Sequence, residues 1–262
     1  MDLLAEIMRS KRIRVEAAKK AVPGEAIHTQ ALFCRRDANK HALTTALNTL
    51  DGPGIIAEFK RRSPSKGEIC DSADPAAMAR RYQSGGARAI SVLTEEDHFS
   101  GSLEDLIAVR KAVSLPLLRK DFVFDQYQIY ESAAAGADAV LLIVAALDDG
   151  NLVRLRQVIE DELQMDALVE VHNTEEMSRA RNTGAKLIGV NNRNLRTFDV
   201  SIETSVALVA EAPSGATLVS ESGLSSGTDL KRLGGLGYKG FLVGESLMRS
   251  EEPESALRAL IR

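Results

Sequence analysis

The sequence has few of the residues from which metal sites and disulfide frameworks are built. Only two cysteines occur, Cys34 and Cys70, and the four histidines are scattered along 262 residues. Two cysteines cannot form a disulfide framework, and no Cys/His group has the spacing of a zinc site. We therefore expect free thiols in a reducing compartment.

Long apolar segments and a large excess of one charge are also absent. No apolar run is long enough to cross a membrane, and the first 20 residues are charged throughout, without the apolar core of a signal peptide. A formal net charge of −4 provides no broad basic surface for nucleic acid. With 44% apolar and 27% charged residues, the composition is that of a globular protein. We predict a soluble, cytoplasmic protein that binds neither nucleic acid nor membrane.

From Gly54 to the C-terminus, short apolar segments alternate with segments of helical periodicity. The apolar segments predict eight strands, at 54–60, 89–94, 115–121, 137–144, 166–172, 187–193, 217–223 and 240–247. The helical segments lie at about 74–85, 102–114, 125–135, 148–164, 173–183, 201–212, 226–235 and 252–261. Near-continuous apolar strands are expected when helices cover both faces of a parallel sheet. Eight strand–helix units predict an α/β fold, a (β/α)8 TIM barrel, with a doubly wound parallel sheet as the alternative.

Glycines at a regular interval support the count of eight units. Gly86, Gly136, Gly184 and Gly237 recur about every 50 residues, each where a predicted helix ends and a strand begins. Glycine is favoured there because helices commonly end with a residue in the left-handed conformation. The interval spans two strand–helix units, which places these glycines before the second, fourth, sixth and eighth strands.

Residues 1–50 precede this pattern and predict an N-terminal helical extension. Positions 2–20 have the periodicity of an amphipathic helix, and Leu43, Leu47 and Leu50 suggest a second, short helix. No linker or low-complexity segment interrupts the chain. We therefore predict a single domain over residues 1–262, with the extension at 1–50 and the barrel at 54–262.

The first predicted strand ends in charged residues that call for a functional explanation. Glu58 and Lys60 are two residues apart, so both side chains point to the same face of the strand. A buried charge costs several kcal/mol unless it is paired. The loop that follows, with Ser63 and Lys66, has the residue types of an anion-binding segment.

Charged residues also end the third, fifth and seventh predicted strands. They are Lys120, Glu170 and Glu221, and with Glu58 they come from the four odd-numbered strands. In a (β/α)8 barrel, alternate strands contribute the side chains of one interior layer, and catalytic residues gather at the C-terminal ends of the strands. We therefore predict a charged layer just below the mouth of the barrel. The alternative, a salt-bridge network with a packing role alone, does not explain why all four lie at one end of their strands.

Further polar residues predict a site for an anionic, phosphorylated ligand. Asn191 and Arg193 lie two residues apart at the end of the sixth strand, on one face. Small residues follow the seventh and eighth strands, where barrel enzymes often bind phosphate through backbone N–H groups. The candidate phosphate-binding residues are Ser222, Gly223, Gly244, Glu245 and Ser246, with Ser63 and Lys66 from the first loop.

Three other residues have two interpretations each. Phe99 and Phe122 follow the second and third strands, and they either pack at the rim or form apolar walls for an aromatic substrate. His172 lies two residues after Glu170, and a helix-capping or loop role is favoured over a side chain that faces the mouth.

Several separate motifs, taken in this order, resemble those of the indole-3-glycerol phosphate synthase family. The resemblance extends from about residue 54 to residue 249. The motifs are Ala57-Glu58-Phe59-Lys60-Arg61-Arg62-Ser63-Pro64-Ser65-Lys66-Gly67, Leu93-Thr94-Glu95-Glu96-Asp97-His98-Phe99-Ser100-Gly101-Ser102, Leu118-Arg119-Lys120-Asp121-Phe122, Leu168-Val169-Glu170-Val171-His172, Gly189-Val190-Asn191-Asn192-Arg193-Asn194-Leu195, Ser220-Glu221-Ser222-Gly223 and Leu242-Val243-Gly244-Glu245-Ser246-Leu247-Met248.

The resemblance implies a carbon–carbon lyase of tryptophan biosynthesis that needs neither a metal nor a cofactor. Its substrate would be 1-(2-carboxyphenylamino)-1-deoxyribulose 5-phosphate, closed to indole-3-glycerol phosphate with loss of carbon dioxide and water. Lys120 would be the general acid at the substrate ketone, held by an ion pair with Glu58. Glu170 would stabilise the cationic intermediate and assist proton removal. Lys60 would lie near the departing carboxylate, and the division of acid roles between Lys60 and Lys120 stays open.

The same resemblance implies how the substrate binds. Asn191 and Arg193 would orient the anthranilate end, and Glu221 would orient the sugar hydroxyls. Phe99 and Phe122 would form the walls. The residues implied for the phosphate are Ser63, Gly223, Gly244 and the backbone N–H of Glu245, with Ser222 and Ser246 beside them.

Segment 31–40 does not follow the family's usual approach to the first strand, so the way it covers the site is not predicted. Two other functions are alternatives. A Schiff-base aldolase would use Lys120 as its nucleophile, but neighbouring carboxylates raise the pKa of a lysine and oppose nucleophilic attack. A catalytically silent binding barrel would be expected to lack Lys120 or Glu170, and both are present. We expect a monomer that binds a small phosphorylated molecule, with weak association as the alternative.

Overall fold

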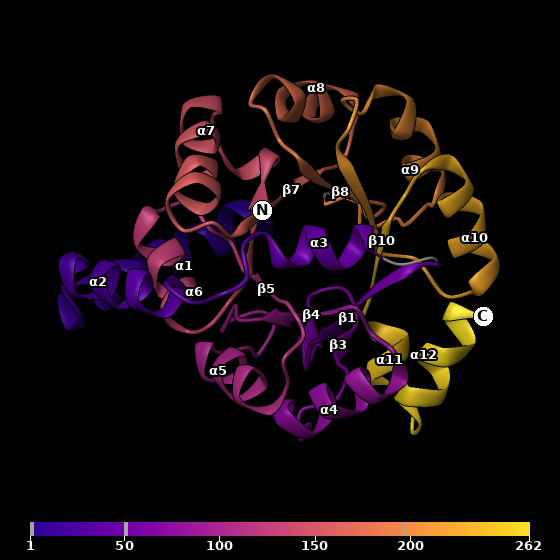
Figure 1. The fold of residues 1–262 in the computed structure, drawn as a ribbon, viewed down its shortest axis with the longest axis horizontal. Helices are drawn as coiled ribbons and strands as arrows, with labels where there is room; N and C mark the ends of the chain where they lie inside the picture. The colour runs from indigo at the N-terminus through magenta and orange to yellow at the C-terminus, as the bar shows by residue number, and fades with distance from the viewer. Residues whose placement is uncertain (1–2, 50–51, 196) are drawn as a thin grey trace.

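Eight parallel strands close into a barrel in the computed structural model, which describes residues 3–49, 52–195 and 197–262 (Figure 1). Around the barrel the strand order is β1-β10-β9-β8-β7-β6-β5-β4. The strands are β1 (Gly54–Phe59), β4 (Ala89–Leu93), β5 (Leu117–Lys120), β6 (Ala139–Ile143), β7 (Asp166–Val171), β8 (Leu187–Asn191), β9 (Thr217–Glu221) and β10 (Gly240–Val243). The predicted (β/α)8 barrel with an N-terminal helical extension is therefore confirmed, and the doubly wound sheet is wrong.

Helices follow the barrel strands and form the outer ring in Figure 1. They are α4 (Pro75–Gly85), α5 (Leu103–Ala112), α6 (Gln126–Ala134), α7 (Asp149–Gln157), α8 (Thr174–Asn182), α9 (Glu203–Leu208), α10 (Gly227–Leu236) and α12 (Pro253–Ile261). A π-helical turn, η2 (Val158–Glu162), extends α7, and 3-10 turns η1 (Val144–Ala146) and η3 (Val209–Glu211) follow β6 and α9. All eight predicted helices are present, most of them shorter than expected at one end or both.

Turn chemistry explains where several helices begin and end. The side chains of Asp74, Ser102 and Asn173 accept hydrogen bonds from the first turns of α4, α5 and α8. The glycines at the predicted interval, including Gly86 and Gly237, all have positive φ, between 76° and 114°. A side chain is strained in this left-handed conformation, which confirms the reason given for the repeat.

Three elements differ from the sequence-based prediction. The segment 240–247 was predicted as one strand, but β10 ends at Val243 and a short helix, α11 (Glu245–Met248), follows. The first loop forms a small antiparallel hairpin, β2 (Arg62–Ser63) with β3 (Gly67–Glu68), that was not predicted. A third difference is α2 (Gly24–Arg35), which occupies a segment that the sequence left unassigned.

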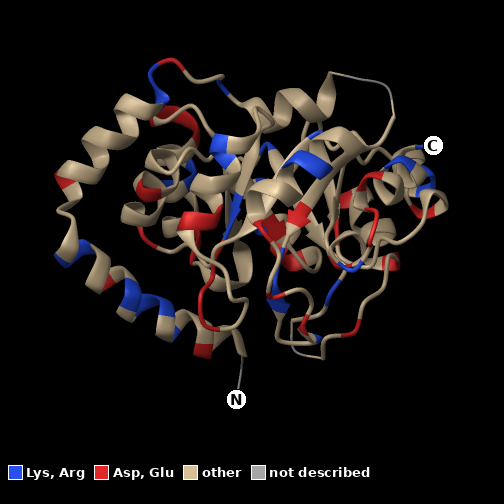
Figure 2. Cartoon of the chain, turned by 90° about the horizontal axis from the view of Figure 1, so that it is seen from below, with Lys and Arg blue, Asp and Glu red and all other residues tan. Residues whose placement is uncertain are grey.

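The N-terminal extension forms α1 (Leu3–Ala21), α2 and α3 (Ala42–Asn48). The predicted helices at 2–20 and around Leu43 and Leu47 are confirmed, while Asp2 and Leu50 lie outside the described residues. In Figure 2 α1 and α2 form an arm along one side of the barrel, with many of the Lys and Arg residues of the arm on α1. Both helices contact α6. In the described part of the chain, no helix is long and apolar enough to cross a membrane.

Helix α3 closes the end of the barrel opposite the mouth. Leu43 and Leu47 are buried and join the interior cluster of apolar side chains. Asp166, at the start of β7, fixes this helix, because its carboxylate accepts the backbone N–H of Leu43 at 2.9 Å and the hydroxyl of Thr44 at 2.6 Å. The interior also contains one apolar residue two positions before each predicted charged residue, namely Ile56, Leu118, Leu168 and Val219. The barrel is thus filled with apolar side chains below its charged layer.

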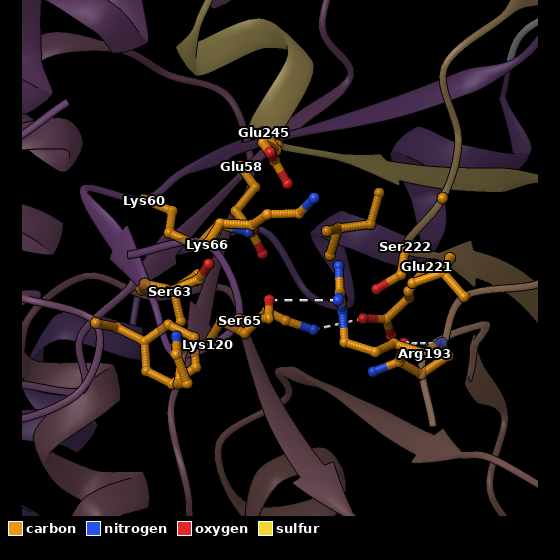
Figure 3. A pocket seen from close by; sticks show the side chains of 18 of the residues that line it. Glu58, Lys60, Ser63, Ser65, Lys66, Lys120, Arg193, Glu221, Ser222 and Glu245 are labelled. Atoms are coloured by element: carbon orange, nitrogen blue, oxygen red, sulfur yellow. Dashed lines mark hydrogen bonds and ion pairs between the residues drawn. The ribbon is translucent and has the colours of Figure 1, made fainter. Parts of the chain in front are cut away.

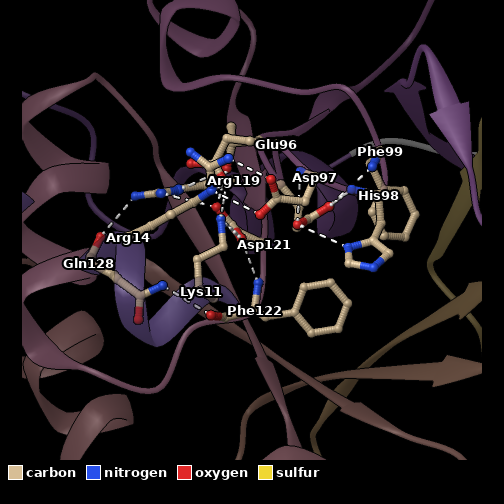
Figure 4. A network of polar contacts seen from close by, with 12 residues as sticks. Lys11, Arg14, Glu96, Asp97, His98, Phe99, Arg119, Asp121, Phe122 and Gln128 are labelled. Atoms are coloured by element: carbon tan, nitrogen blue, oxygen red, sulfur yellow. Dashed lines mark hydrogen bonds and ion pairs between the residues drawn. The ribbon is translucent and has the colours of Figure 1, made fainter. Parts of the chain in front are cut away.

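Helix α1 is attached to the mouth end by a buried lysine (Figure 4). Lys11 is only 3% exposed, and its ammonium lies 2.5 Å from a Glu96 carboxylate oxygen and 2.8 Å from one of Asp121. The same Asp121 carboxylate pairs with the buried guanidinium of Arg119. The two carboxylates outweigh the effect of burial and raise the pKa of Lys11 above its ordinary value. This contact joins the extension to the residue that follows Lys120.

We predict that Lys11→Met lowers the free energy of unfolding by roughly 3–5 kcal/mol, because it leaves two carboxylates around a site that loses its cation. Urea-induced unfolding would measure the change. Lys19→Met is the matched control on the same helix. Its side chain is 34% exposed and pairs with Asp125 at 2.7 Å, so the expected loss is below about 1 kcal/mol. Equal effects of the two substitutions would show that the Lys11 contact does not anchor α1.

Candidate active site

A cavity of about 730 Å³ opens at the C-terminal ends of the strands. Every residue predicted for the site lines it (Figure 3). These residues are Glu58, Lys60, Ser63, Phe99, Lys120, Phe122, Glu170, Asn191, Arg193, Glu221, Ser222, Gly223, Gly244 and Glu245. A cavity of this size accommodates a small organic molecule.

Lys120 lies at the centre of the charged layer. Its ammonium is 3.2 Å from Oε2 of Glu170 and also contacts Oε2 of Glu221. All three side chains are nearly buried, with exposed fractions of 14% for Lys120, 4% for Glu170 and 1% for Glu221. The ion pairs join β5 to β7 and β9 across the barrel interior.

Burial and charge act in opposite directions on these groups. Burial alone would lower the pKa of Lys120, but Glu221, Glu170 and Glu58 outweigh it and raise the pKa above the ordinary lysine value. For Glu170, burial would raise the pKa, and the cations Lys120 and His172 outweigh it, so the carboxyl stays ionised. Burial and the charge of Glu170 instead raise the pKa of Glu221 to about 7, although Lys120 acts against this. The two carboxyls beside one ammonium therefore have different protonation states near neutral pH.

The expected ion pair between Glu58 and Lys120 is wrong. Oε1 of Glu58 lies 2.5 Å from the ammonium of Lys60, and no contact within 4 Å joins Glu58 to Lys120 in the described structure. The nearer lysine is preferred because Lys60 follows β1 only two residues after Glu58 and faces the same side. Glu58 still acts on Lys120 through its charge, as one of three carboxylates that raise the lysine pKa.

Two glycines leave room for the buried carboxylates. A Cβ atom at Gly189, in β8, would collide with Oε1 of Glu221. At Gly244 a Cβ would lie 2.6 Å from Oε1 of Glu58. The same Oε1 of Glu221 is buried without a hydrogen-bond partner in the described structure. An unsatisfied buried oxygen at a cavity wall is available to a substrate donor.

The predicted phosphate residues surround one end of the cavity. The chain turns sharply after β9, where Ser222 and Gly223 have φ of 66° and 73°. A side chain at Gly223 would meet Val200 at 2.5 Å, so this turn requires glycine. Gly244 precedes α11, whose first backbone N–H groups have no acceptor within the helix. Backbone donors from both turns thus lie beside Ser63 in the cavity wall.

Arg193 extends from the end of β8 toward the first loop. Its guanidinium donates to the Ser65 hydroxyl at 3.3 Å and to the Phe198 carbonyl at 3.4 Å. The side-chain oxygen of Asn191 accepts the backbone N–H of Arg193 at 3.0 Å and stabilises this turn. No carboxylate of the described residues pairs with Arg193, which leaves its charge available to an anion in the cavity.

Phe99 and Phe122 form adjacent apolar walls, with ring centroids 6.2 Å apart. Buried carboxylates hold their backbones: Glu95 accepts the N–H of Phe99 at 3.1 Å, and Asp121 accepts that of Phe122 at 2.8 Å (Figure 4). Of the two interpretations given above, these positions favour cavity walls over rim packing.

Sequence reasoning missed several residues of the site. Leu3, Leu4 and Ile7 of α1 line the cavity, as does Phe198 from the loop after β8. The apolar face of α1 was visible in its periodicity, but nothing in the pattern indicated that it covers the mouth. His172 also differs from its favoured role, because its ring contacts both Glu170 and Glu176.

The fold and the site together define a class of protein, a (β/α)8-barrel enzyme with a charged cavity at the C-terminal ends of its strands. The family model for indole-3-glycerol phosphate synthase matches residues 4–260. The chain belongs to the indole-3-glycerol phosphate synthase family.

Individual relatives agree with this assignment. An indole-3-glycerol phosphate synthase of Azospirillum brasilense is 47% identical over 265 residues, which cover 99% of each chain. One of Carboxydothermus hydrogenoformans is 44% identical over 266 residues, covering 98% of this chain and 99% of the relative. Among solved structures, KGPDC from Streptococcus mutans is similar with a TM-score of 0.59 at 16% identity. That match covers 80% of this chain and 96% of the other, and it shows the fold alone.

We predict that Gly189→Ala reduces turnover about 10-fold or more, because the added methyl group displaces Glu221 from Lys120, a loss of a charged hydrogen bond. Steady-state kinetics and a thermal unfolding curve would measure the effect. Gly235→Ala, in α10, is the control: nothing lies within 4 Å of the added atom, so activity should be unchanged. Wild-type turnover of Gly189→Ala would contradict the packing of Glu221 described here.

Proposed function

We propose that the chain closes 1-(2-carboxyphenylamino)-1-deoxyribulose 5-phosphate to indole-3-glycerol phosphate, releasing carbon dioxide and water, by general acid–base catalysis. The observation that carries this proposal is the buried ammonium of Lys120 between Glu170 and Glu221 at the barrel mouth. The enzyme would act in the cytoplasm as a monomer on this phosphorylated substrate. Light scattering on the purified protein would test the monomer.

Lys120 is the proposed acid for ring closure. As the carboxylate-bearing ring carbon attacks the substrate ketone, the oxygen of that ketone gains negative charge and requires a proton. A lysine whose pKa is raised by carboxylates is fully protonated at neutral pH and can supply it. The same raised pKa disfavours the alternative of a Schiff base on Lys120, which needs a neutral amine.

Glu170 is the proposed stabiliser of the cationic intermediate and base for the final proton. Ring closure places positive charge on the substrate next to its nitrogen, and a fixed carboxylate lowers the energy of that charge. The lowered pKa of Glu170 keeps its carboxyl ionised for this purpose. A carboxylate in a nearly closed cavity acts more strongly than one in water.

Lys60 is proposed to lie near the departing carboxylate of the substrate, with Glu58 as its partner. Either Lys60 or Lys120 supplies the proton for the loss of water, and the charges around both are compatible with that step. The revised partner of Glu58 makes it a positioning residue for Lys60. Asn191 remains in the catalytic set through its contact with the turn that carries Arg193.

The ends of the substrate have matching groups in the cavity. We assign the carboxyphenyl end to Arg193 and to the walls Phe99 and Phe122, and the sugar hydroxyls to Glu221. The phosphate is assigned to the group formed by Ser63, Ser222, Gly223, Gly244 and the backbone N–H of Glu245. Cationic and backbone donors at opposite ends suit a substrate with two anionic groups.

We predict that Lys120→Met abolishes measurable turnover, and that Glu170→Gln lowers kcat about 10²-fold or more. Product formation can be followed by indole fluorescence with EDTA present, since the protein contains no Trp.

Lys239→Met is the matched control. Lys239 is an exposed lysine just before β10, at the end of the barrel opposite the mouth, so the variant should retain wild-type activity. The proposal fails if Lys120→Met keeps near-wild-type kcat while folded, or if borohydride traps a substrate adduct on Lys120.

A further inference from the structure

His172 lies on the far side of Glu170 from Lys120. Its Nε2 is 3.3 Å from Oε1 of Glu170, whereas Oε2 of the same carboxylate faces the ammonium of Lys120. The imidazole is only 9% exposed, and it is not among the described residues that line the cavity. One carboxylate is therefore held by two cationic groups, one inside the reaction cavity and one behind it.

Glu176 fixes the other edge of the imidazole. Its Oε2 lies 2.9 Å from Nδ1 of His172 and also accepts the backbone N–H of His172 at 2.8 Å. Asn173, which caps the start of α8, accepts the backbone N–H of Glu176 and donates to its Oε1 at 2.9 Å. The turn between β7 and α8 thus holds the ring in one orientation without any substrate.

A carboxylate at each ring nitrogen requires a proton on both nitrogens. Glu170 of β7 and Glu176 of α8 are the charged groups that face the ring, and beyond Glu170 lie Lys120 of β5 and Glu221 of β9. Burial alone would lower the pKa of His172, but the two carboxylates outweigh it and raise the pKa to about 10. At neutral pH the ring is an imidazolium.

The proposed chemistry gives this second cation a purpose. Lys120 becomes neutral when it transfers its proton to the substrate, and at that moment Glu170 loses its counter-charge inside the cavity. A cation that takes no part in the proton transfer keeps Glu170 ionised and aimed at the substrate through this step. Water cannot serve in its place because the carboxylate is 4% exposed.

We propose that His172, held by Glu176, is a positioning residue that fixes the orientation and the charge of Glu170 during catalysis. The inference rests on the role assigned to Glu170 under the proposed function. It extends the site beyond the cavity wall, to a residue whose side chain does not touch the substrate.

Two variants test the proposal by kinetics. His172→Gln should lower kcat by about 10- to 100-fold with KM nearly unchanged, the size expected when a hydrogen bond to a charged group is lost. Glu176→Gln removes one of the two carboxylates that stabilise the imidazolium, so His172 loses its proton at lower pH. The basic limb of the kcat–pH profile should then move down by about one pH unit or more. His28→Gln is the control, because His28 on α2 pairs with Glu162 far from the site, and its profile should match the wild type.

A role of His172 confined to folding predicts a different result. It would lower the unfolding temperature of His172→Gln and Glu176→Gln and leave the basic limb where it is in the wild type. That outcome, or wild-type kcat in His172→Gln, would overturn the proposal.

A measurement without substrate separates this inference from the proposed function. NMR of ¹⁵N-labelled imidazoles in the wild type should show His172 doubly protonated at pH 8, and Glu176→Gln should lower its pKa. A neutral ring at pH 8 overturns the inference whatever the activity. A protonated ring in a protein without turnover would instead count against the proposed function and leave the charge of His172 established.

Discussion

The site depends on one buried ammonium that is shared by two carboxylates. Lys120 must be desolvated to lie below the mouth, and this is tolerable only because Glu170 and Glu221 lie beside it. The three groups cannot all have ordinary protonation behaviour. Glu170 takes the ionised state, and the raised pKa of Glu221 gives the cluster a proton that it can lose near neutral pH. The chemistry assigned to the cavity requires both an acid and a base, and this unequal division supplies them.

The barrel holds this cluster in place from below and from the side. Apolar residues two positions before each charged residue fill the interior, and α3 closes the opposite end. Gly189 leaves the space that Glu221 occupies. At the mouth, the buried Lys11 links α1 to Asp121, so the extension contributes both cavity wall and anchor. Each of these features limits the motion of charged side chains that would otherwise be free to rearrange.

The alternation of strand residues was sufficient to predict the barrel and the charged layer. Strand periodicity and the position of Lys120, Glu170 and Glu221 at strand ends depend on local sequence alone. The partner of Glu58 could not be obtained in this way, because a contact across the barrel depends on the stagger of the strands, which no single strand encodes. For the same reason, the sequence did not reveal that α1 covers the mouth, or that His172 turns toward Glu170. Helix α2 was missed since its periodicity is weak, and α11 because a four-residue helix after a strand continues an apolar run.

The most direct test of this account is a ¹³C NMR titration of the glutamate carboxyl carbons in the labelled protein, with Glu170→Gln and Glu221→Gln used to assign the two signals. The account predicts that the Glu221 signal titrates with a pKa of about 7, while the pKa of Glu170 lies well below the usual glutamate range. If both carboxyls titrate near the ordinary value of 4.5, Lys120 is not shared in the way described, and the division of acid and base in the site is wrong.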